Sequence, residues 1–448
     1  MKKFIESISN VWKIEELKNR ILITLGLLLV YRFGAHVTLP GIDATQLTGL
    51  AGQTKNGLGS ILDMFTGGAF SKASVFALGI MPYISASIVV QLMGIAIPYL
   101  QKLQSDGESG RKKINQITRW LTIVITLVQG PTYIYNLYRT LPSSAFLLGF
   151  NSFEFLFSSV VILVTGTIFA MWLGEKITDK GIGNGISLLI MVGILARLPQ
   201  AFMQEFTTRV TNNNGGPMLL VIEIIIWLLV IISCVLLVMA IRKIPVQYAR
   251  RTTSGDYEQD MMGGNRQWIP LKLNASGVMP IIFAQAIMFI PAAVAGLSKS
   301  DASQTIVGAF SNMFGFWYNL VFATLIVVFT FFYTAITVPT NKMSDDLKRS
   351  GGFIPGVRPG AETSDYLDKV MSLITFPGSL FLALIAVFPA IVVSLMDVQQ
   401  SWAMFFGGTS LIIMVGVAID TIQQINSYLL NRHYDGLMKS GKNRKAVA

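Results

Sequence analysis

Residue types that perform covalent or metal chemistry are sparse in this sequence. Cys234 is the single cysteine and lies in an apolar run, so the chain can form neither an internal disulfide nor a cluster of thiolate ligands. His36 and His433 are far apart in sequence, and neither belongs to a metal-ligand or catalytic-triad pattern. We therefore expect no metal site and no cofactor, and we predict that the protein is not an enzyme.

One glycine-rich motif, GIGNG at residues 181–185, is superficially similar to a phosphate-binding loop. A phosphate loop follows a strand, whereas this motif follows a charged segment and opens an apolar helix. A tight turn that lets the next helix begin close to its neighbour explains the glycines better.

Charged residues inside apolar segments are the usual markers of ion paths and proton relays in membranes. Arg32 and Glu223 are the clear cases in this sequence. A structural partner, or snorkelling toward the membrane surface, is the favoured role for both, and an ion path is the alternative.

The elements that must position these residues are membrane helices. Of the 448 residues, 52% are hydrophobic and 13% are charged, and the mean hydropathy is +0.57. A soluble domain would be about 25% charged. Since a bilayer span needs about 20 mostly apolar residues, we predict ten spans, near residues 21–40, 74–98, 117–137, 154–173, 185–200, 217–240, 275–296, 317–338, 371–395 and 402–428.

Lysine and arginine are distributed unevenly between the connections. With the N-terminus inside, 28 of the 35 lie in inner segments. Six lie in outer segments: Lys55, Lys72, Arg139, Arg197, Arg209 and Lys299. Because such residues favour the cytoplasmic side, we predict a multi-pass protein of the cell inner membrane with both termini in the cytoplasm. The same bias explains the net charge of +11 without a nucleic-acid partner.

Two of the predicted cytoplasmic loops are longer than ordinary connections. The loop at 242–272 carries Arg250 and Arg251, and the loop at 340–369 carries Arg358 within the run FIPGVRPG. The prolines and glycines of that run restrict the backbone and can present Arg358 at the loop tip. Long basic loops of this kind suit the docking of a large acidic partner.

Between the first two spans, residues 57–70 read GLGSILDMFTGGAF, an apolar piece that is too short to cross a bilayer. Irregular backbone at membrane depth is tolerated only where protein or water satisfies its polar groups. We predict a re-entrant element here, with a helix lying on the outer surface as the alternative.

The polar, glycine-rich stretch at the chain's midpoint leaves five predicted spans on either side, and halves with an odd number of spans would be inverted relative to one another. The predicted order is an amphipathic cytoplasmic segment (1–20), an N-terminal half (21–206), a hinge loop (207–216), a C-terminal half (217–428) and a cytoplasmic tail (429–448).

Six long strings resemble the SecY family of translocon channel subunits. They are ALGIMPYISASIVVQL (77–92), SDGESGRKKINQITR (105–119), GEKITDKGIGNGISLLI (174–190), LKLNASGVMPIIFA (271–284), SGGFIPGVRPGAET (350–363) and FFGGTSLIIMVGVAID (405–420). The resemblance runs nearly end to end. It implies an all-α membrane protein with ten transmembrane helices in two pseudo-symmetric inverted halves of five, and a re-entrant plug.

The resemblance also implies roles for individual residues. A pore ring would comprise Ile84, Ile88, Ile186, Ile190, Ile282 and Ile413, and a plug would include Ser60, Ile61, Leu62, Asp63, Met64, Phe65, Gly67 and Gly68. A lateral gate would be lined by Ser85, Ser87, Gln91, Thr122, Thr126, Ser276 and Gln285. Lipid contact or packing for the isoleucines, and ordinary interhelical hydrogen bonds for the polar residues, are the alternatives.

Partners follow from the same resemblance. Arg358 matches an arginine that engages the motor ATPase SecA, and Arg250 and Arg251 match a basic tip that contacts the ribosome or SecA. The adjoining segment TSGDYEQDMMGGN departs from the common pattern. SecE and SecG subunits, translocating polypeptides and membrane lipids complete the implied partners.

The function implied is a central protein-conducting channel of the Sec translocon. It would pass unfolded secretory polypeptides across the cytoplasmic membrane and release hydrophobic segments laterally into lipid. A hydrophobic constriction excludes water and ions by dewetting, yet it can deform around a passing chain. A secondary transporter of small solutes is the alternative, disfavoured because it needs a polar or ion-coordinating midplane.

Overall fold

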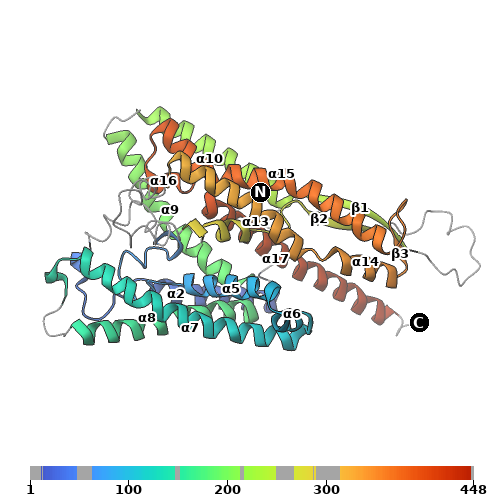
Figure 1. Ribbon diagram of the computed structural model, residues 1–448, viewed down its shortest axis with the longest axis horizontal. Helices are drawn as coiled ribbons and strands as arrows, with labels where there is room; N and C mark the ends of the chain where they lie inside the picture. The colour runs from blue at the N-terminus through green and yellow to red at the C-terminus, as the bar shows by residue number, and fades with distance from the viewer. Residues whose placement is uncertain are drawn as a thin grey trace, which may run out of the picture. The chain divides into compact units, whose positions relative to one another are not determined.

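The computed structural model describes most of the chain, and the described part is predominantly helical (Figure 1). The description covers residues 12, 14–47, 63–146, 152–211, 216–248, 267–285, 287–288 and 313–444. Within these ranges, six helices are long and apolar enough to cross a membrane, and the bent pair Met81–Gly94 and Pro98–Gln104 would make a seventh. Length and composition therefore make the chain a multi-pass membrane protein.

The chain divides into two compact units. Unit 1 comprises Met1–Asn214, Gln399–Trp402 and Val417–Ala448, and unit 2 comprises Gly215–Val398 and Ala403–Gly416. The division after Asn214 falls in the polar stretch 207–216. From Val417 onward, however, the last predicted span belongs to unit 1, so the units do not simply follow chain order.

Specific contacts explain why the end of the chain belongs to unit 1. The backbone N–H of Gly183 donates to Gln424 Oε1 at 2.8 Å. The guanidinium carbon of Arg20 lies 5.2 Å from the centre of the Tyr428 ring, a cation–π contact. The first contact joins the last helix to the turn at residues 181–184, and the second joins it to the helix that contains Arg20.

Unit 1 consists mainly of long helices. These are α2 (Glu15–Gly34), α5 (Met81–Ala96), α6 (Pro98–Ser105), α7 (Gly107–Thr140), α8 (Ser152–Lys180), α9 (Gly185–Thr211) and the later part of α17 (Gly408–Arg444), with the short helices η1 (Ala44–Gln46) and η2 (Ser143–Ala145). Helix α7 packs against α5, α6 and α8, and α8 also packs against α2 and α9. Ile134, Leu137 and Leu163 are fully buried in this core.

The break between α5 and α6 has a local cause. The two helices are bent by 104°. Pro98 has no backbone N–H to continue the helix, and it restricts the residue before it; Ile97 is accordingly extended. At its other end, the span predicted at 74–98 begins with turns at residues 74–80 and becomes helical at Met81.

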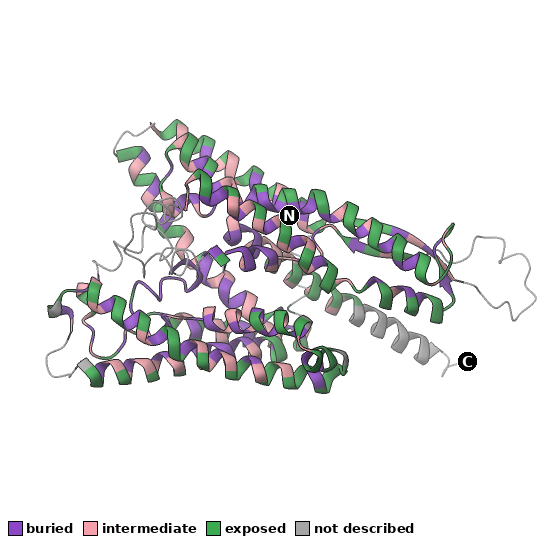
Figure 2. Cartoon of the chain, in the orientation of Figure 1, coloured by how far each residue is buried: buried purple, intermediate pink, exposed green. Residues whose placement is uncertain are grey.

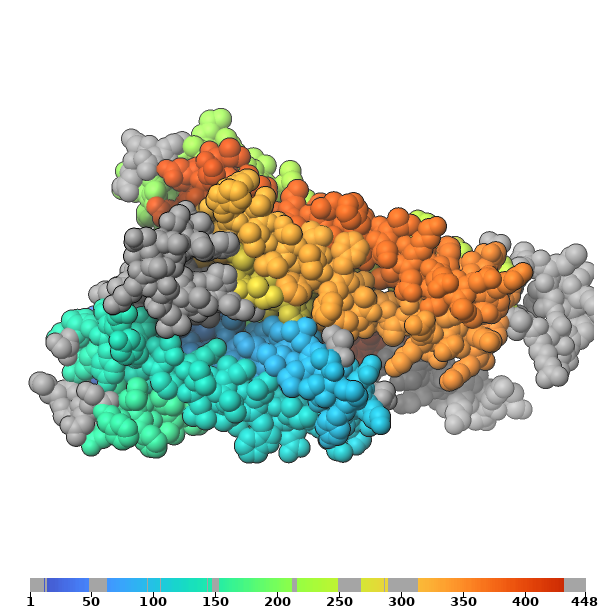
Figure 3. Space-filling model, viewed as in Figure 1, coloured from blue at the N-terminus to red at the C-terminus, as the bar shows by residue number. Residues whose placement is uncertain are grey.

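Unit 2 is built on α10 (Gly216–Met239), α13 (Phe316–Thr337) and α15 (Ala361–Met396), with a helical stretch at 279–285. Helices α13 and α15 pack together, and their side chains lie next to one another in the space-filling view (Figure 3). Ile281, Ile326, Leu382 and Ile412 are fully buried in the core of this unit. The short helix α16 (Gln400–Ala403), of which residues 400–402 belong to unit 1, precedes α17.

The two basic loops of unit 2 contain regular structure that the sequence analysis missed. Strands β1 (Ile241–Tyr248), β2 (Gln267–Lys272) and β3 (Gly352–Phe353) form an antiparallel sheet in the order β2-β1-β3, and α14 (Thr340–Arg349) packs beside it. Ile244 and Val246 of β1, two residues apart, point into a core with Leu347 and Leu367. These strands and α14 therefore form a folded base from which the rest of both loops extends.

The long helices have many exposed positions (Figure 2), and many of the exposed side chains are apolar. Helix α10 buries Glu223, Val230, Cys234 and Leu237. It exposes Leu228, Leu229, Ile232 and Leu236, among others. Such a surface suits lipid contact. Cys234 is a fully buried packing residue, and Glu223 is fully buried in the same helix.

Most of the predicted spans are helical in the structure. Those at 154–173, 185–200, 217–240, 317–338, 371–395 and 402–428 are confirmed as helices long and apolar enough to cross. The span at 117–137 lies within α7, whereas the span at 21–40 is helical only to Gly34, where α2 ends. Charged and polar residues lower the apolar content of both helices. The span at 275–296 lies partly outside the described residues, so the count of ten stays a prediction.

Candidate functional site

Residues 63–71, which we call the 63–71 segment, fold into a compact buried turn of unit 1. Its backbone closes on itself, because Gly68 N–H donates to the Asp63 carbonyl at 2.8 Å. Gly67 and Gly68 adopt φ of 65° and 92°, a region that favours glycine. Met64, Phe65 and Phe70 are all buried. This burial favours the re-entrant interpretation over a helix lying on the outer surface.

The 63–71 segment packs directly on α9. A Cβ built on Gly193 would lie 2.8 Å from the Phe65 carbonyl oxygen, and one built on Gly67 would lie 2.8 Å from Gly193 Cα. The two backbones therefore touch at a point where neither residue can carry a side chain without displacement. Gly193 is three residues beyond Ile190 and seven beyond Ile186, so all three share one helix face.

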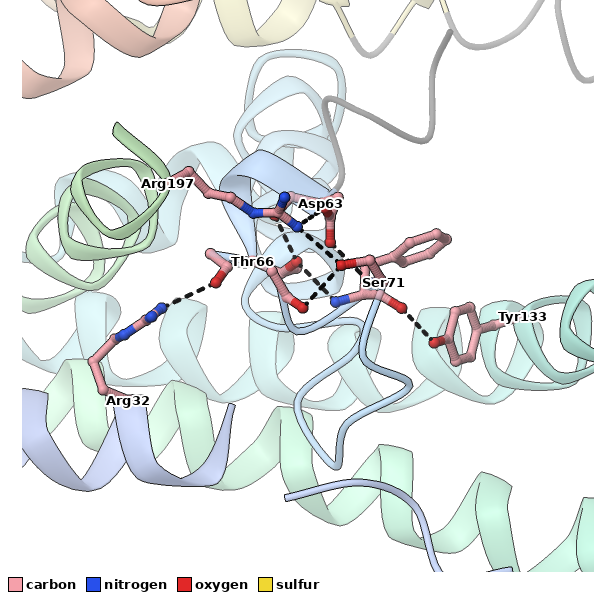
Figure 4. A network of polar contacts seen from close by, with 9 residues as sticks. Arg32, Asp63, Thr66, Ser71, Tyr133 and Arg197 are labelled. Carbon is pink, nitrogen blue, oxygen red and sulfur yellow. Dashed lines mark hydrogen bonds and ion pairs between the residues drawn. The ribbon is translucent and has the colours of Figure 1, made fainter. Parts of the chain in front are cut away.

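An ion pair fixes the start of the segment to the same face of α9 (Figure 4). Arg197, four residues beyond Gly193, pairs with Asp63 Oδ2. Its Nη2 also donates to Ser71 Oγ at 2.9 Å, and Asp63 Oδ1 accepts from the Ser71 N–H at 2.8 Å. The Asp63 carboxylate thus joins both ends of the segment to each other and to α9.

Two further side chains hold the segment from other helices. Arg32 of α2 donates to the Gly67 carbonyl at 3.1 Å, and the Tyr133 hydroxyl of α7 donates to the Phe70 carbonyl at 2.8 Å (Figure 4). Arg32 therefore has a structural partner, the role favoured from the sequence. A short irregular segment would otherwise leave the carbonyls of Gly67 and Phe70 without hydrogen-bond partners.

The GIGNG motif is a turn, as the sequence analysis favoured. Its amide groups are occupied: Ile182 N–H donates to Thr24 Oγ1 at 3.0 Å, and Gly185 N–H donates to Thr178 Oγ1 at 2.9 Å. Gly183 has φ of 83°, and Gly185 lies so close to the Gly174 carbonyl that it has no room for a side chain. The motif therefore lets α9 start against α8, with its N–H groups already engaged.

Comparison with known proteins decides the family. The family model described as SecY matches residues 74–422. The protein translocase subunit SecY of Haemophilus influenzae is 41% identical over 427 residues, covering 95% of this chain and 94% of that protein. The protein translocase subunit SecY of Thermotoga maritima is 38% identical and covers 98% and 99%.

This chain belongs to the SecY family. Its relatives' names as translocase subunits agree with the prediction that it is not an enzyme, and they lend no support to a transporter of small solutes.

Solved structures of SecY and Sec61 channels share the fold at low sequence identity. One, described as a protein conducting channel, has a TM-score of 0.59 at 16% identity and covers 92% of each chain. A second, from a study in which the plug domain of SecY stabilises the closed state and maintains a membrane seal, has a TM-score of 0.60 at 17% identity with the same coverage. Canine Sec61 in a ribosome-channel complex has a TM-score of 0.54 at 16% identity.

The isoleucines expected to form a SecY-type ring all lie on described segments. Ile84 and Ile88 are on α5, and Ile186 and Ile190 are on α9, all in unit 1; Ile282 and Ile413 are in unit 2. Ile88, Ile190 and Ile413 are buried, and the other three are partly buried. Because these residues belong to different units, their convergence into one ring stays a prediction.

The polar residues expected at a lateral gate mostly have local partners. The hydroxyls of Thr122 and Thr126 are buried and donate to carbonyls one turn earlier in α7, each at 2.7 Å. Gln91 Nε2 donates to Ser87 Oγ at 3.2 Å, and Ser276 Oγ donates to Asn274 Oδ1 at 3.3 Å. These hydrogen bonds are local, each between residues two or four positions apart in sequence, and account for the contacts of these side chains.

The two remaining gate candidates differ in their surroundings. Ser85 lies partly buried on α5. Gln285 lines a pocket within unit 2 together with Tyr318, Asn319 and Ser410. A role for any of the seven residues in lateral opening stays a prediction.

Arg358 lies in the connection between β3 and α15. Its side chain is 87% exposed, and its Nη1 lies 3.7 Å from Glu362 Oε1, a contact too exposed to hold it firmly. It is therefore free to meet a partner. Ser60, Ile61 and Leu62 of the expected plug, and Arg250 and Arg251, lie outside the described residues.

Sequence reasoning missed Arg197, which it grouped with the outer connections. The structure places it within α9, which continues to Thr211. The signal was present in the spacing, since Ile186, Ile190, Gly193 and Arg197 recur at intervals of four, three and four residues, the pattern of one helix face.

We predict that Gly193→Ala loosens the 63–71 segment, because its methyl group would lie 2.8 Å from a backbone oxygen that cannot move aside alone. Overpacking of this kind typically costs about 1–3 kcal/mol. Ion leak through vesicles containing the purified protein should rise several-fold.

Gly26→Ala of α2 is the matched control, since nothing lies within 4 Å of its added Cβ. Equal leak from the two variants would contradict the packing of the segment on α9.

Proposed function

We propose that this chain is the central protein-conducting channel of a Sec translocon in the cell inner membrane, with both termini in the cytoplasm. Unfolded secretory polypeptides would pass through it, and hydrophobic segments would leave it sideways into lipid. The observation that carries the proposal is the packing of the 63–71 segment on the α9 face that bears Ile186 and Ile190.

The resting state on this proposal has two barriers in series. Ile190 belongs to a ring of aliphatic side chains that excludes water and ions by dewetting. Gly193 and Arg197 follow one and two turns farther along α9, roughly 4.5 and 10 Å by helical rise. The 63–71 segment bound there would cover the outer side of the ring.

The chemistry of the site suits a substrate of almost any sequence. Flexible isoleucine side chains deform around a passing polypeptide and present no hydrogen-bonding group that would select particular residues. The segment can leave as a unit, because most of its hydrogen bonds are internal and the external attachments described above are three side chains, those of Arg197, Arg32 and Tyr133, and the backbone contact with Gly193.

Partners would bind on the cytoplasmic side. The sheet β2-β1-β3 gives the basic loops a folded base, and Arg358 presents an exposed charge there. We propose that the ribosome and the SecA motor dock on this side; the likeness to canine Sec61 from a ribosome-channel complex supports the first. SecE and SecG would complete the channel within the membrane.

The test of the channel is a photocrosslinker at Ile88, with the lipid-facing Leu229 of α10 as the control position. A secretory chain arrested in transit should crosslink at Ile88 and not at Leu229, which is 61% exposed on an apolar helix face. Crosslinks at Leu229 alone would refute a central channel.

A polar substitution in the proposed isoleucine ring should increase the passage of ions through the channel. We predict that Ile190→Asn raises ion leak of reconstituted vesicles and allows export of a reporter with a defective signal sequence, since an amide lets water enter the constriction. Leu229→Asn is the matched control, and a leak no greater in Ile190→Asn than in that control would count against the ring.

Charge reversal at Arg358, in the loop where the SecA motor is proposed to bind, should block motor-driven export. Arg358→Glu places a carboxylate where a cation is expected to meet an acidic partner, and export of a secreted reporter should fall at least tenfold, an effect of about 1.4 kcal/mol. Lys369→Glu, elsewhere in the same predicted loop, is the control for net charge. Normal export by Arg358→Glu would remove this residue from the docking surface.

A further inference from the structure

The Asp63 carboxylate is buried and paired with the guanidinium of Arg197. Its own side chain is 5% exposed, whereas that of its partner Arg197 is 28% exposed. Arg32 reaches the same segment through the Gly67 carbonyl, and Lys72 follows the segment directly in sequence. A buried carboxylate is stable only when its charge is paired and its oxygens are hydrogen-bonded.

Both carboxylate oxygens of Asp63 are engaged when the segment is folded on α9. Oδ2 pairs with Arg197, and Oδ1 accepts from the Ser71 N–H at 2.8 Å. The hydroxyl of Ser71 extends this hydrogen-bond network, because it accepts from Arg197 Nη2 and donates to the Gly68 carbonyl at 3.2 Å. Removing the segment from α9 breaks the bonds to Arg197 while leaving those internal to the segment.

The strength of this attachment depends on water. An ion pair in a dry, low-dielectric site resists separation strongly, while the same pair in contact with water is worth little. The pair would therefore oppose the first displacement of the segment and cease to oppose it once water enters. Such a contact produces a threshold, in contrast to apolar packing, which is lost gradually with area.

We infer that the Asp63–Arg197 ion pair sets the threshold that a signal sequence must overcome to open the channel. The pair acts as a specificity-determining contact, one that excludes polypeptides whose targeting segments bind weakly. This inference rests on the proposed channel function and assigns to Arg197, a residue outside the expected ring and plug, a part in substrate discrimination.

A double-mutant cycle tests the pair. Asp63→Asn keeps the shape and an oxygen for the Ser71 N–H but removes the charge, and Arg197→Gln removes the cation. Each single variant should increase ion leak and export of a reporter with a defective signal sequence by roughly tenfold, the effect of about 1.4 kcal/mol. The double variant Asp63→Asn/Arg197→Gln should match either single one, because the same interaction is lost once.

Two controls accompany the cycle. Lys72→Gln removes a neighbouring positive charge without touching the pair and should behave as the unmodified protein does. Export of a reporter with an intact signal sequence should be unchanged in all variants, which shows that each is folded and conducting. Arg197→Lys, which keeps the charge, should lie nearer the unmodified protein than Arg197→Gln does.

Single variants indistinguishable from Lys72→Gln would overturn the inference, as would effects that multiply in the double variant. Either result leaves the channel itself intact if arrested chains still crosslink at Ile88. Failure of that crosslink in the unmodified protein would instead refute the proposed function, so the two failures are distinguishable.

Discussion

The arrangement of unit 1 depends on one close approach, that of the 63–71 backbone to α9. Gly67 and Gly193 permit this approach, because a side chain on either residue would collide with backbone atoms of the segment that contains the other. The approach brings the Asp63 carboxylate within reach of Arg197, and α2 and α7 then supply Arg32 and Tyr133 for the remaining carbonyls. The absence of side chains at Gly67 and Gly193 is therefore the primary requirement, and the polar contacts depend on the close approach that it allows.

The same approach reconciles an irregular segment with a membrane environment. Residues 66–71 form turns, and peptide groups in turns lack the regular partners of a helix or strand, which lipid cannot replace. Here the segment bonds to itself and to three helices, so it can be buried and still be released as a unit. A sealing element must meet both requirements, because a rigidly integrated helix could not leave and an unsatisfied loop could not be buried.

The sequence predicted those features that depend on local pattern. Apolar runs such as 217–240 and 317–338 are helices because their length and composition leave no other structure compatible with lipid. The GIGNG turn was predictable because glycine at a helix start has a small set of explanations. Resemblance to the SecY family, carried by six ordered strings, gave the function that composition alone could not give.

Features that depend on tertiary pairing escaped prediction. Strand β1 pairs with β3, whose residues lie roughly a hundred positions later, and no local signal announces such a partner. Its own sequence, IRKIPVQY, mixes charge and proline with alternating apolar residues. Arg197 looked like a boundary residue because an arginine near the end of an apolar run usually marks the membrane surface. Its true role emerges only when residues 63 and 197 are brought together.

The central claim is that the 63–71 segment rests on α9 and leaves it when a polypeptide passes. Pulsed electron paramagnetic resonance can measure this between spin labels at Lys72→Cys and Met203→Cys, two exposed positions of unit 1, in a Cys234→Ser background. The account predicts one narrow distance distribution in the resting protein and a longer, broader one with a secretory chain arrested in transit. An unchanged distribution in a sample whose arrested chain crosslinks at Ile88 would contradict it.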